Sequence, residues 1–368
     1  MSELLVFVGT YTASTPDGSK GIYAARFDDA TGKLSRLAPV AELPNPSWVT
    51  VSRDRRFLYA VSEVGVADST GTPAGLVVAY SIAADGKLTE LNRVSSGGAD
   101  PCHLAIDRTG RTVAVANYTG GSTVSFHVGS DGRLGAATKD QHAGKGPNAQ
   151  RQEAAHAHSV DFVADDRLLL SCDLGNDRVY VYRHDPRAGA ITAHEPAFVG
   201  LEPGAGPRHL AVHPSGRYVY VLTELSSHVA VFAWNATAGT LVQRQSVSTV
   251  PVGTPPSNST AEIVVHPSGR FVYASNRGHD SIAVFSVDAR NGRLTRLANT
   301  PTGGSTPRNF ALDPSGRWLL AANQRSNSIV TFAIDQSKGT LTPSGATLTV
   351  PRPVCVAFVP STGTPSRG

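Results

Sequence analysis

Two histidines, an arginine and a glutamate lie where polar loops meet strand-like apolar segments. His156 and His158 end a long polar stretch that begins at Asp140. Arg208 follows a turn rich in Gly and Pro, and Glu224 ends a strand-like segment in the same repeat unit. An imidazole can exchange a proton near neutral pH, and a guanidinium can bind an anion or pair with a carboxylate. These side chains could do acid–base chemistry on an anionic ligand, or Arg208 and Glu224 could form a purely structural ion pair.

One phrase, repeated six times, predicts the elements that position these residues. An apolar strand, a Pro-Ser-Gly-Arg turn or a variant of it, and a second strand begin at residues 48, 103, 158, 209, 262 and 309. The steps between these starts are 55, 55, 51, 53 and 47 residues. This spacing is typical of the four-stranded blades of a β-propeller.

A second phrase, a strand followed by a Gly turn and Leu or Ile, recurs seven times. Residues 4–10 resemble a second strand, and residues 354–359 resemble a first strand without its partner. We therefore expect an all-β, seven-bladed β-propeller with four-stranded blades, closed by a blade that the N- and C-termini share. A single domain would span residues 1–359, followed by a disordered C-terminal tail at residues 360–368.

Composition argues against several functional classes. The chain has 368 residues, a formal net charge of +4 and a pI near 9.0, with its Lys and Arg residues scattered. This basicity is too mild to predict nucleic-acid binding. No apolar stretch approaches the roughly 18 residues of a membrane helix. Because the N-terminus lacks the regions of a signal peptide, we expect a cytoplasmic protein with no membrane contact.

The cysteines predict no special chemistry. Three of them, without CxxC spacing, indicate neither a disulfide framework nor a zinc site. Cys102 and Cys172 are better interpreted as small buried apolar residues than as nucleophiles. A closed propeller needs no partner for stability, so we expect a monomer.

Propeller geometry predicts where the polar residues gather. The first strand of each blade lines the channel, and its start lies beside the end of the second strand, so both ends open on one mouth. This mouth would add His103, Asp173, Arg277 and Arg308 to His156 as candidates for substrate binding. The recurrence of His103 with the repeat favours a structural role, and Arg277 and Arg308 could instead pair with loop acids such as Asp280.

Five motifs stand out beside the repeats: Gly9-Thr-Tyr-Thr12, Gly21-Ile-Tyr23, residues 146–159, residues 204–209 and Thr223-Glu-Leu225. Neither the Arg-Gln-Glu…His-x-His loop nor the Gly-x-Gly-Pro-Arg-His turn follows from propeller construction. Together these motifs resemble those of the seven-bladed propeller lactonases. The resemblance runs from Gly9 to about Val359, and that family includes the propeller type of 6-phosphogluconolactonase, with a fungal 3-carboxymuconate lactonising enzyme among its relatives.

The resemblance implies a metal-independent lactone hydrolase that needs no cofactor and acts on 6-phosphogluconolactone in the pentose phosphate pathway. In that family a His, an Arg and a Glu are proposed to form the catalytic site, and by motif these are His158, Arg208 and Glu224. His158 or Glu224 would deprotonate water, and Arg208 would stabilise the oxyanion; we favour His158 as the base. Arg277 and Arg308 would anchor a phosphate or carboxylate of the substrate.

Three alternatives stay open on the sequence alone. A carboxymuconate-type cycloisomerase, or a hydrolase of another lactone, would use the same side chains. A non-catalytic propeller could bind a protein or peptide at the mouth, although such a module should present exposed aromatic anchors there. A different group of propeller lactonases holds a divalent cation, for which Glu63, Asp173 and Glu224 would be candidate ligands, but the motifs match the group without metal.

Overall fold

A computed structural model describes the chain except for residues 1–2, 13–17, 66–74 and 360–368. The predicted C-terminal tail, residues 360–368, therefore lies outside the described residues. Within the described part, 28 β-strands form and no helix does. These strands make seven four-stranded sheets, the number of blades that the sequence predicts.

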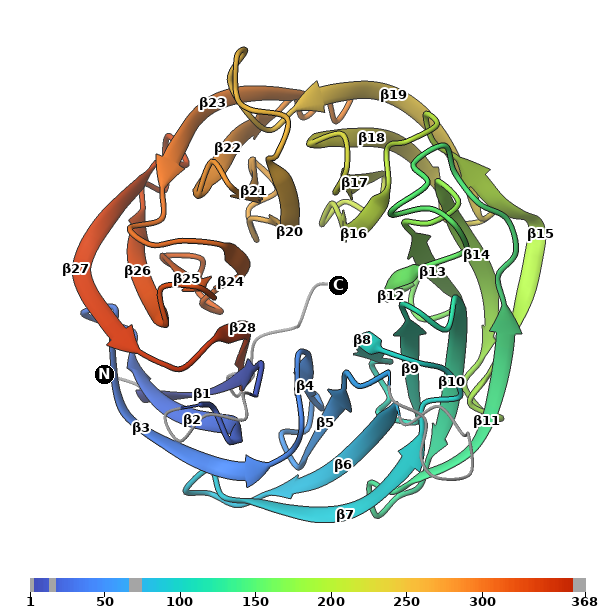
Figure 1. Ribbon diagram of the computed structural model, residues 1–368, viewed down its shortest axis with the longest axis horizontal. Helices are drawn as coiled ribbons and strands as arrows, with labels where there is room; N and C mark the ends of the chain where they lie inside the picture. Colours follow the sequence, from blue (N-terminus) through green and yellow to red (C-terminus); the bar gives the residue numbers. More distant parts are fainter. Residues whose placement is uncertain (1–2, 13–17, 66–74, 360–368) are drawn as a thin grey trace. The chain divides into compact units, whose positions relative to one another are not determined.

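Six sheets each take four strands that are consecutive in the chain (Figure 1). The strands of the first three are β4 (Val49–Val51), β5 (Phe57–Ser62), β6 (Leu76–Ile82), β7 (Leu88–Ser95), β8 (Pro101–Ile106), β9 (Thr112–Asn117), β10 (Ser122–Val128), β11 (Leu134–Gln141), β12 (Ala157–Val163), β13 (Leu168–Asp173), β14 (Arg178–Asp185) and β15 (Ala190–Gly200). The strands of the next three are β16 (Pro207–Val212), β17 (Tyr218–Thr223), β18 (His228–Asn235), β19 (Thr240–Ser248), β20 (Ser259–Val265), β21 (Phe271–Arg277), β22 (Ser281–Val287), β23 (Leu294–Pro301), β24 (Pro307–Leu312), β25 (Trp318–Asn323), β26 (Ser328–Ile334) and β27 (Leu341–Thr349).

The seventh sheet joins the two ends of the chain. It has the order β28 (Pro353–Phe358), β1 (Glu3–Thr10), β2 (Gly21–Asp28) and β3 (Lys33–Glu42). β1 and β28 pair antiparallel, with Val8 opposite Val356 and Phe7 opposite Ala357. This pairing confirms the predicted blade that the N- and C-terminal segments share.

Burial follows the position of a strand within its sheet. The second strands, such as β9 and β17, are buried at every position, whereas the outermost strands, such as β11, are mostly exposed. A strand covered on both faces reads as an apolar run, which explains why the Tyr-Val-Tyr-Val-Leu stretch at 218–222 is so uniform. Contacts divide the chain into two compact units, one built on the described residues within 1–40, 209–234 and 241–359 and the other on those within 41–208 and 235–240.

The recurrent Gly turn of one blade packs against a tyrosine of the preceding blade. Gly292 has φ +74°, and a Cβ added there would lie 2.4 Å from the Tyr218 ring. Its carbonyl accepts a hydrogen bond of 3.1 Å from the hydroxyl of the buried Tyr220. Tyr59 makes the same contact with the carbonyl of Gly132, at 3.0 Å. Glycine is therefore required both by its backbone conformation and by the close aromatic ring.

Candidate functional site

The loop before β12 is folded around one buried amide. Gln152 is fully buried, and its side chain donates hydrogen bonds to the Leu174 carbonyl (2.9 Å) and to Asp177 Oδ1 (2.8 Å). The Gln152 carbonyl accepts the Gly146 N–H (3.0 Å), and the Gln152 N–H donates to the Asn148 carbonyl (2.7 Å). These contacts fix the long polar stretch that leads to His156 and His158. Sequence reasoning recognised the loop but not the role of Gln152.

Asp177 ties this loop to the turn that carries Arg208. Its carboxylate accepts the backbone N–H groups of Gly204 and Gly206, each at 2.7 Å, in addition to the Gln152 amide. Two motifs that are about fifty residues apart are thus joined by one buried carboxylate. Arg208, at the start of β16, is itself buried. The sequence does not reveal this role of Asp177.

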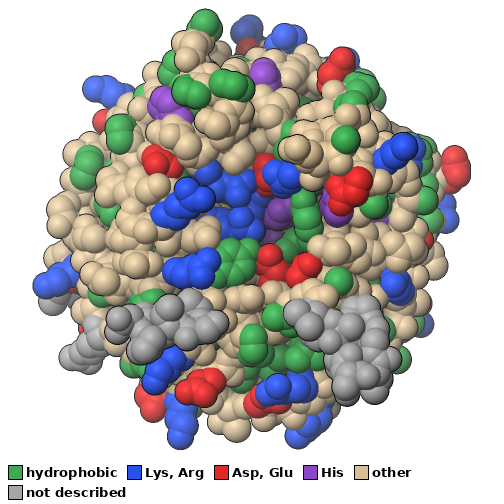
Figure 2. All heavy atoms as spheres, viewed as in Figure 1, with side chains coloured by type: hydrophobic (Ala, Val, Ile, Leu, Met, Phe, Trp, Pro, Cys, Tyr) green, Lys and Arg blue, Asp and Glu red, His purple; other side chains and the backbone are tan. Residues whose placement is uncertain are grey.

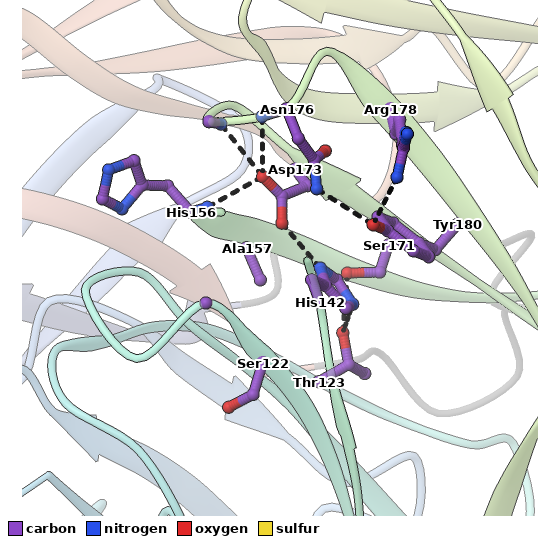
Figure 3. A network of polar contacts seen from close by, with 12 residues as sticks. Ser122, Thr123, His142, His156, Ala157, Ser171, Asp173, Asn176, Arg178 and Tyr180 are labelled. Atoms are coloured by element: carbon purple, nitrogen blue, oxygen red, sulfur yellow. Dashed lines mark hydrogen bonds and ion pairs between the residues drawn. The ribbon is translucent and has the colours of Figure 1, made fainter. Parts of the chain in front are cut away.

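Asp173 holds the backbone at His156 (Figure 3). Its Oδ1 accepts the N–H groups of His156 (2.8 Å), Gly175 (2.9 Å) and Asn176 (3.2 Å). Its Oδ2 accepts a 2.6 Å hydrogen bond from Nδ1 of His142, and both side chains of this pair are 0% exposed. Asp173 was predicted to bind substrate; its burial and four donors favour a positioning role.

His142 extends the network away from the loop. Its ring stacks on Tyr180 with centroids 3.8 Å apart, and its Nε2 lies 2.7 Å from the Tyr182 hydroxyl. The Tyr182 hydroxyl donates to Asp140 Oδ2 at 2.8 Å, and burial raises the pKa of Tyr182 well above its usual value. His142 lies on the segment between β11 and β12, and sequence analysis did not select it.

The His156 ring contacts Tyr118 and Glu153. It stacks on Tyr118 with centroids 4.6 Å apart, and its Nδ1 lies 3.0 Å from the Tyr118 carbonyl. Its Nε2 lies 3.1 Å from Glu153 Oε1. The pKa of Glu153 is lowered, first by a hydrogen bond from its own backbone N–H and then by the charge of His156. Both ring nitrogens of His156 thus face oxygen atoms of the loop and of β9's end.

His158 is buried at the start of β12, beside a thiol and an aromatic ring. Cys102 Sγ lies 3.6 Å from His158 Nδ1, and the Tyr118 ring is edge-on with centroids 5.3 Å apart. The Cys102 thiol also donates to the His158 carbonyl (3.3 Å). Burial raises the pKa of the Cys172 thiol well above its usual value, which agrees with the prediction that this residue is a small buried apolar group.

The residues that recur with the repeat bridge neighbouring first strands. Nδ1 of His103 accepts the Val160 N–H (3.3 Å), and its ring packs on Trp48 with centroids 4.0 Å apart. In the other unit, Asn309 accepts the Val356 N–H (2.9 Å). The shared pattern supports a structural role for His103, as its recurrence in the sequence suggested.

Glu262 contacts His209 and Asn309, the residues at the equivalent position in the two neighbouring blades. Its Oε1 lies 3.1 Å from His209 Nδ1, and its Oε2 accepts the Asn309 side-chain amide (2.6 Å). Glu262 Oε1 also accepts the N–H of Ile263 (2.9 Å). These contacts indicate that His209, like His103, has a structural role.

Glu224 pairs with an arginine from the next blade. Arg277 Nη2 lies 2.9 Å from Glu224 Oε2, and it also donates to the Thr260 carbonyl (2.7 Å). Both side chains of the pair are largely buried. The sequence had suggested Asp280 as a partner of Arg277, but Asp280 Oδ1 accepts the N–H groups of Gly278 (3.1 Å) and Thr306 (2.8 Å).

Arg308 and Arg352 flank Tyr11. Arg308 Nη2 donates to the Tyr11 hydroxyl (2.8 Å), and the guanidinium carbons of Arg308 and Arg352 lie 5.2 and 5.8 Å from the Tyr11 ring centroid. A guanidinium group can bind an anion in a bidentate fork. Two guanidinium groups at one phenol make this the strongest candidate for an anion anchor in its unit.

The surface offers few apolar anchors for a protein partner. Among the described residues, the large hydrophobic side chains that are exposed are Phe198, Val242, Val252 and Leu297. Phe198 is the one aromatic of this group, and the Arg178 guanidinium lies over its ring at 4.0 Å. On the face that Figure 2 shows, hydrophobic side chains are scattered among charged ones. This surface argues against the protein-binding alternative.

Within the described residues, no group of three or more His, Cys, Asp or Glu side chains is arranged to hold a metal ion. The same part of the chain contains no helix of the length and hydropathy needed to cross a membrane.

Comparisons with known proteins cover nearly the whole chain. The family model "Lactonase, 7-bladed beta-propeller" matches residues 5–358, which confirms the predicted fold. A Bacillus subtilis protein named 6-phosphogluconolactonase is 38% identical over 361 residues, covering 98% of this chain and 99% of that protein. A Formosa agariphila protein of the same name is 35% identical, covering 84% and 86%. The solved structure of a periplasmic gluconolactonase from Pseudomonas aeruginosa has a TM-score of 0.88 and 33% identity, covering 99% of this chain and 100% of that one.

Proposed function

The chain belongs to the lactonase family of seven-bladed β-propellers, and we propose that it hydrolyses 6-phosphogluconolactone to 6-phosphogluconate in the pentose phosphate pathway. The observation that carries this proposal is the buried Asp177 carboxylate, which joins the loop ending in His158 to the turn that presents Arg208. The names of the full-length relatives support the choice of substrate.

His158 acts as the general base in the proposed reaction. The imidazole takes a proton from water as the water oxygen attacks the lactone carbonyl, and Arg208 stabilises the oxyanion of the tetrahedral intermediate. Collapse of this intermediate breaks the ring C–O bond, and the imidazolium returns the proton to the leaving alkoxide. The contacts of His158 with Tyr118 and Cys102 support this role, because they restrict the orientation of the ring.

The remaining candidates position groups or bind the charged end of the substrate. Glu224 is proposed to orient His158 or Arg208, and its ion pair with Arg277 restricts the orientation of its carboxylate. Arg308, half-buried against Tyr11, is proposed to bind the phosphate, with Arg277 as a second donor. His156, His103 and Asp173 shape the site through the contacts described above.

We also propose a cytoplasmic monomer that works without a metal. Cys102, Cys172 and Cys355 are buried and form no disulfide with any described residue, which suits a reducing compartment. Cell fractionation tests the compartment, and sedimentation equilibrium tests the monomer. Activity that survives excess EDTA is the expected result for metal independence.

The decisive test is hydrolysis of freshly generated 6-phosphogluconolactone, followed against its spontaneous hydrolysis. We expect rapid turnover that is much slower with unphosphorylated gluconolactone and is abolished in His158→Ala and Arg208→Ala. His228→Ala, at the start of β18, is the matched control and should retain full activity. Turnover at the background rate with both lactones would reject the proposal and favour cyclisation or another lactone.

A further inference from the structure

A cavity of about 660 Å³ lies among the hairpin turns of three blades, β4–β7, β8–β11 and β12–β15. The turns follow the ends of the first strands, whereas His158 lies at the start of one, so the cavity is separate from the proposed catalytic residues. Its volume is within the range of about 300–1,000 Å³ that is usual for small-molecule sites. Five arginines line it: Arg53, Arg56, Arg108, Arg111 and Arg187.

A comparison between blades shows why this cavity is unusual. The turn between the first and second strands ends in an equivalent arginine in six blades. In four of them this arginine donates a hydrogen bond to a backbone carbonyl in the outer turn of the next blade. The pairs are Arg167 with Ala236 (3.5 Å), Arg217 with Ala289 (3.1 Å), Arg270 with Gln336, and Arg317 with Asp29 (2.8 Å).

Arg56 and Arg111, the other two equivalents, do not bridge to the next blade within the described residues. Arg56 lies 4.7 Å from the Phe57 ring centroid and 3.8 Å from Asp54, in an ion pair whose side chains are 63% and 51% exposed. The Arg111 guanidinium has no hydrogen bond or ion pair with any described residue. The cavity therefore occupies the place where two inter-blade hydrogen bonds are missing.

Other lining arginines add further donors. The side chains of Arg53 and Arg187 also make no hydrogen bond or ion pair within the described part of the chain. Arg108 differs, because it pairs with Asp165 (2.7 Å) and Asp166 (3.9 Å). Three guanidinium groups thus retain their donors and their positive charge at one concave surface.

We propose that this cavity binds a small molecule that carries a diphosphate or triphosphate group. Guanidinium groups bind phosphate oxygens in bidentate pairs, and three of them match a multiply charged phosphate chain better than a single carboxylate. Phe57 and Val128 supply an apolar wall for the rest of such a ligand. Nothing in the proposed lactone hydrolysis uses these residues, so the two proposals can fail independently.

The test is isothermal titration calorimetry of the full chain in a phosphate-free buffer at 150 mM salt. Pyrophosphate, ATP and adenosine are the three probes. We expect saturable binding of pyrophosphate and ATP, and none of adenosine, because the phosphate chain provides the recognition. No binding of either phosphate compound, or binding of adenosine as tight as that of ATP, would overturn the proposal.

Variants locate the site. The triple variant Arg53→Gln, Arg111→Gln, Arg187→Gln should bind pyrophosphate at least tenfold more weakly than the unmodified chain.

A second triple variant, Arg244→Gln, Arg290→Gln, Arg293→Gln, removes the same charge from exposed positions elsewhere and should bind normally. Equal weakening in the two triple variants would show a general charge effect and refute the site. If the first triple variant fails to fold, each of its single substitutions at an exposed position should still weaken binding about threefold, and unchanged binding in all three would be a refutation.

Discussion

Replacing Asp173 by alanine tests whether the His156–His158 segment is held by one buried carboxylate. The substitution removes the acceptor of three backbone N–H groups and of His142 Nδ1. A buried donor left without a partner costs about 1–3 kcal/mol, and a hydrogen bond to a charged group contributes about 1.5–3 kcal/mol. Because these costs overlap, we expect Asp173→Ala to lower the free energy of unfolding by about 4 kcal/mol.

Asp173→Asn separates the contacts with the backbone N–H groups from the contact with His142. The amide oxygen can still accept the N–H groups of His156, Gly175 and Asn176, while the amide nitrogen now faces His142. His142 can answer by moving its proton from Nδ1 to Nε2, where the Tyr182 oxygen can accept it. We therefore expect a loss of only about 1–2 kcal/mol, roughly that of one charge-assisted hydrogen bond.

Urea unfolding followed by tryptophan fluorescence measures both losses, and lactone hydrolysis measures the effect on the site. A displacement of about 1 Å can cost about a hundredfold in rate, so kcat should fall about a hundredfold in Asp173→Ala and much less in Asp173→Asn. Asp335→Ala is the control, since Asp335 accepts N–H groups of an exposed turn far from the candidate site, so its loss should leave kcat unchanged and lower the free energy of unfolding much less than Asp173→Ala does. If Asp173→Ala unfolded at the same urea concentration as the unmodified chain, the positioning role would be refuted.

The remaining predictions concern single features of the fold and of the site. Gly292→Ala should lower the free energy of unfolding by about 3 kcal/mol, because strain at positive φ adds to overlap with Tyr218. Gly216→Ala, with φ +66° and open space around it, should cost only about 1 kcal/mol, and equal losses in the two variants would contradict this explanation. The pKa of Asp335 is lowered to about 2, first by the Ser337 hydroxyl and then by backbone N–H groups, so its stabilisation is present above pH 4 and is lost as the pH falls to 2. The melting temperature of Asp335→Asn should therefore lie below that of the unmodified chain at pH 6 and much closer to it at pH 2, and an equal difference at the two pH values would exclude the charge as its cause. Asp177→Ala should reduce kcat/KM at least tenfold while Asp177→Asn loses less, and unchanged kinetics in both would show that the link between loop and turn does not support catalysis.

The sequence predicted the blades because their determinants are local. Alternating apolar residues and a Gly turn act within a hairpin of about twenty residues, so each repeat specifies its own strands. The shared blade was predictable too, because residues 354–359 and 4–10 each match half of a repeat. The first strands begin within three residues of the expected positions.

The partners of the candidate residues could not be predicted in the same way. Arg277 pairs with Glu224, 53 residues away, and not with the nearby Asp280, because its side chain extends toward the neighbouring blade. The partners of His142 and Asp177 lie far from them in the sequence, 31 residues from His142 and 25–29 residues from Asp177. Nothing in the local sequence around His142 or Asp177 indicates these contacts. The strands could be predicted because their pattern repeats in every blade, whereas a contact between two single residues has no repeated pattern. The roles of His158, Arg208 and Glu224 stay predictions until their variants are assayed.

The pairing of β28 with β1 has a consequence for biosynthesis. β28 leaves the ribosome more than three hundred residues after β1. At about 5–20 residues per second, β1 waits at least fifteen seconds with one edge unpaired. An unpaired strand edge is a template for association with other chains. The nascent chain thus has a period of vulnerability that ends when β28 pairs with β1, and a chain whose synthesis stops before residue 353 would keep an open edge.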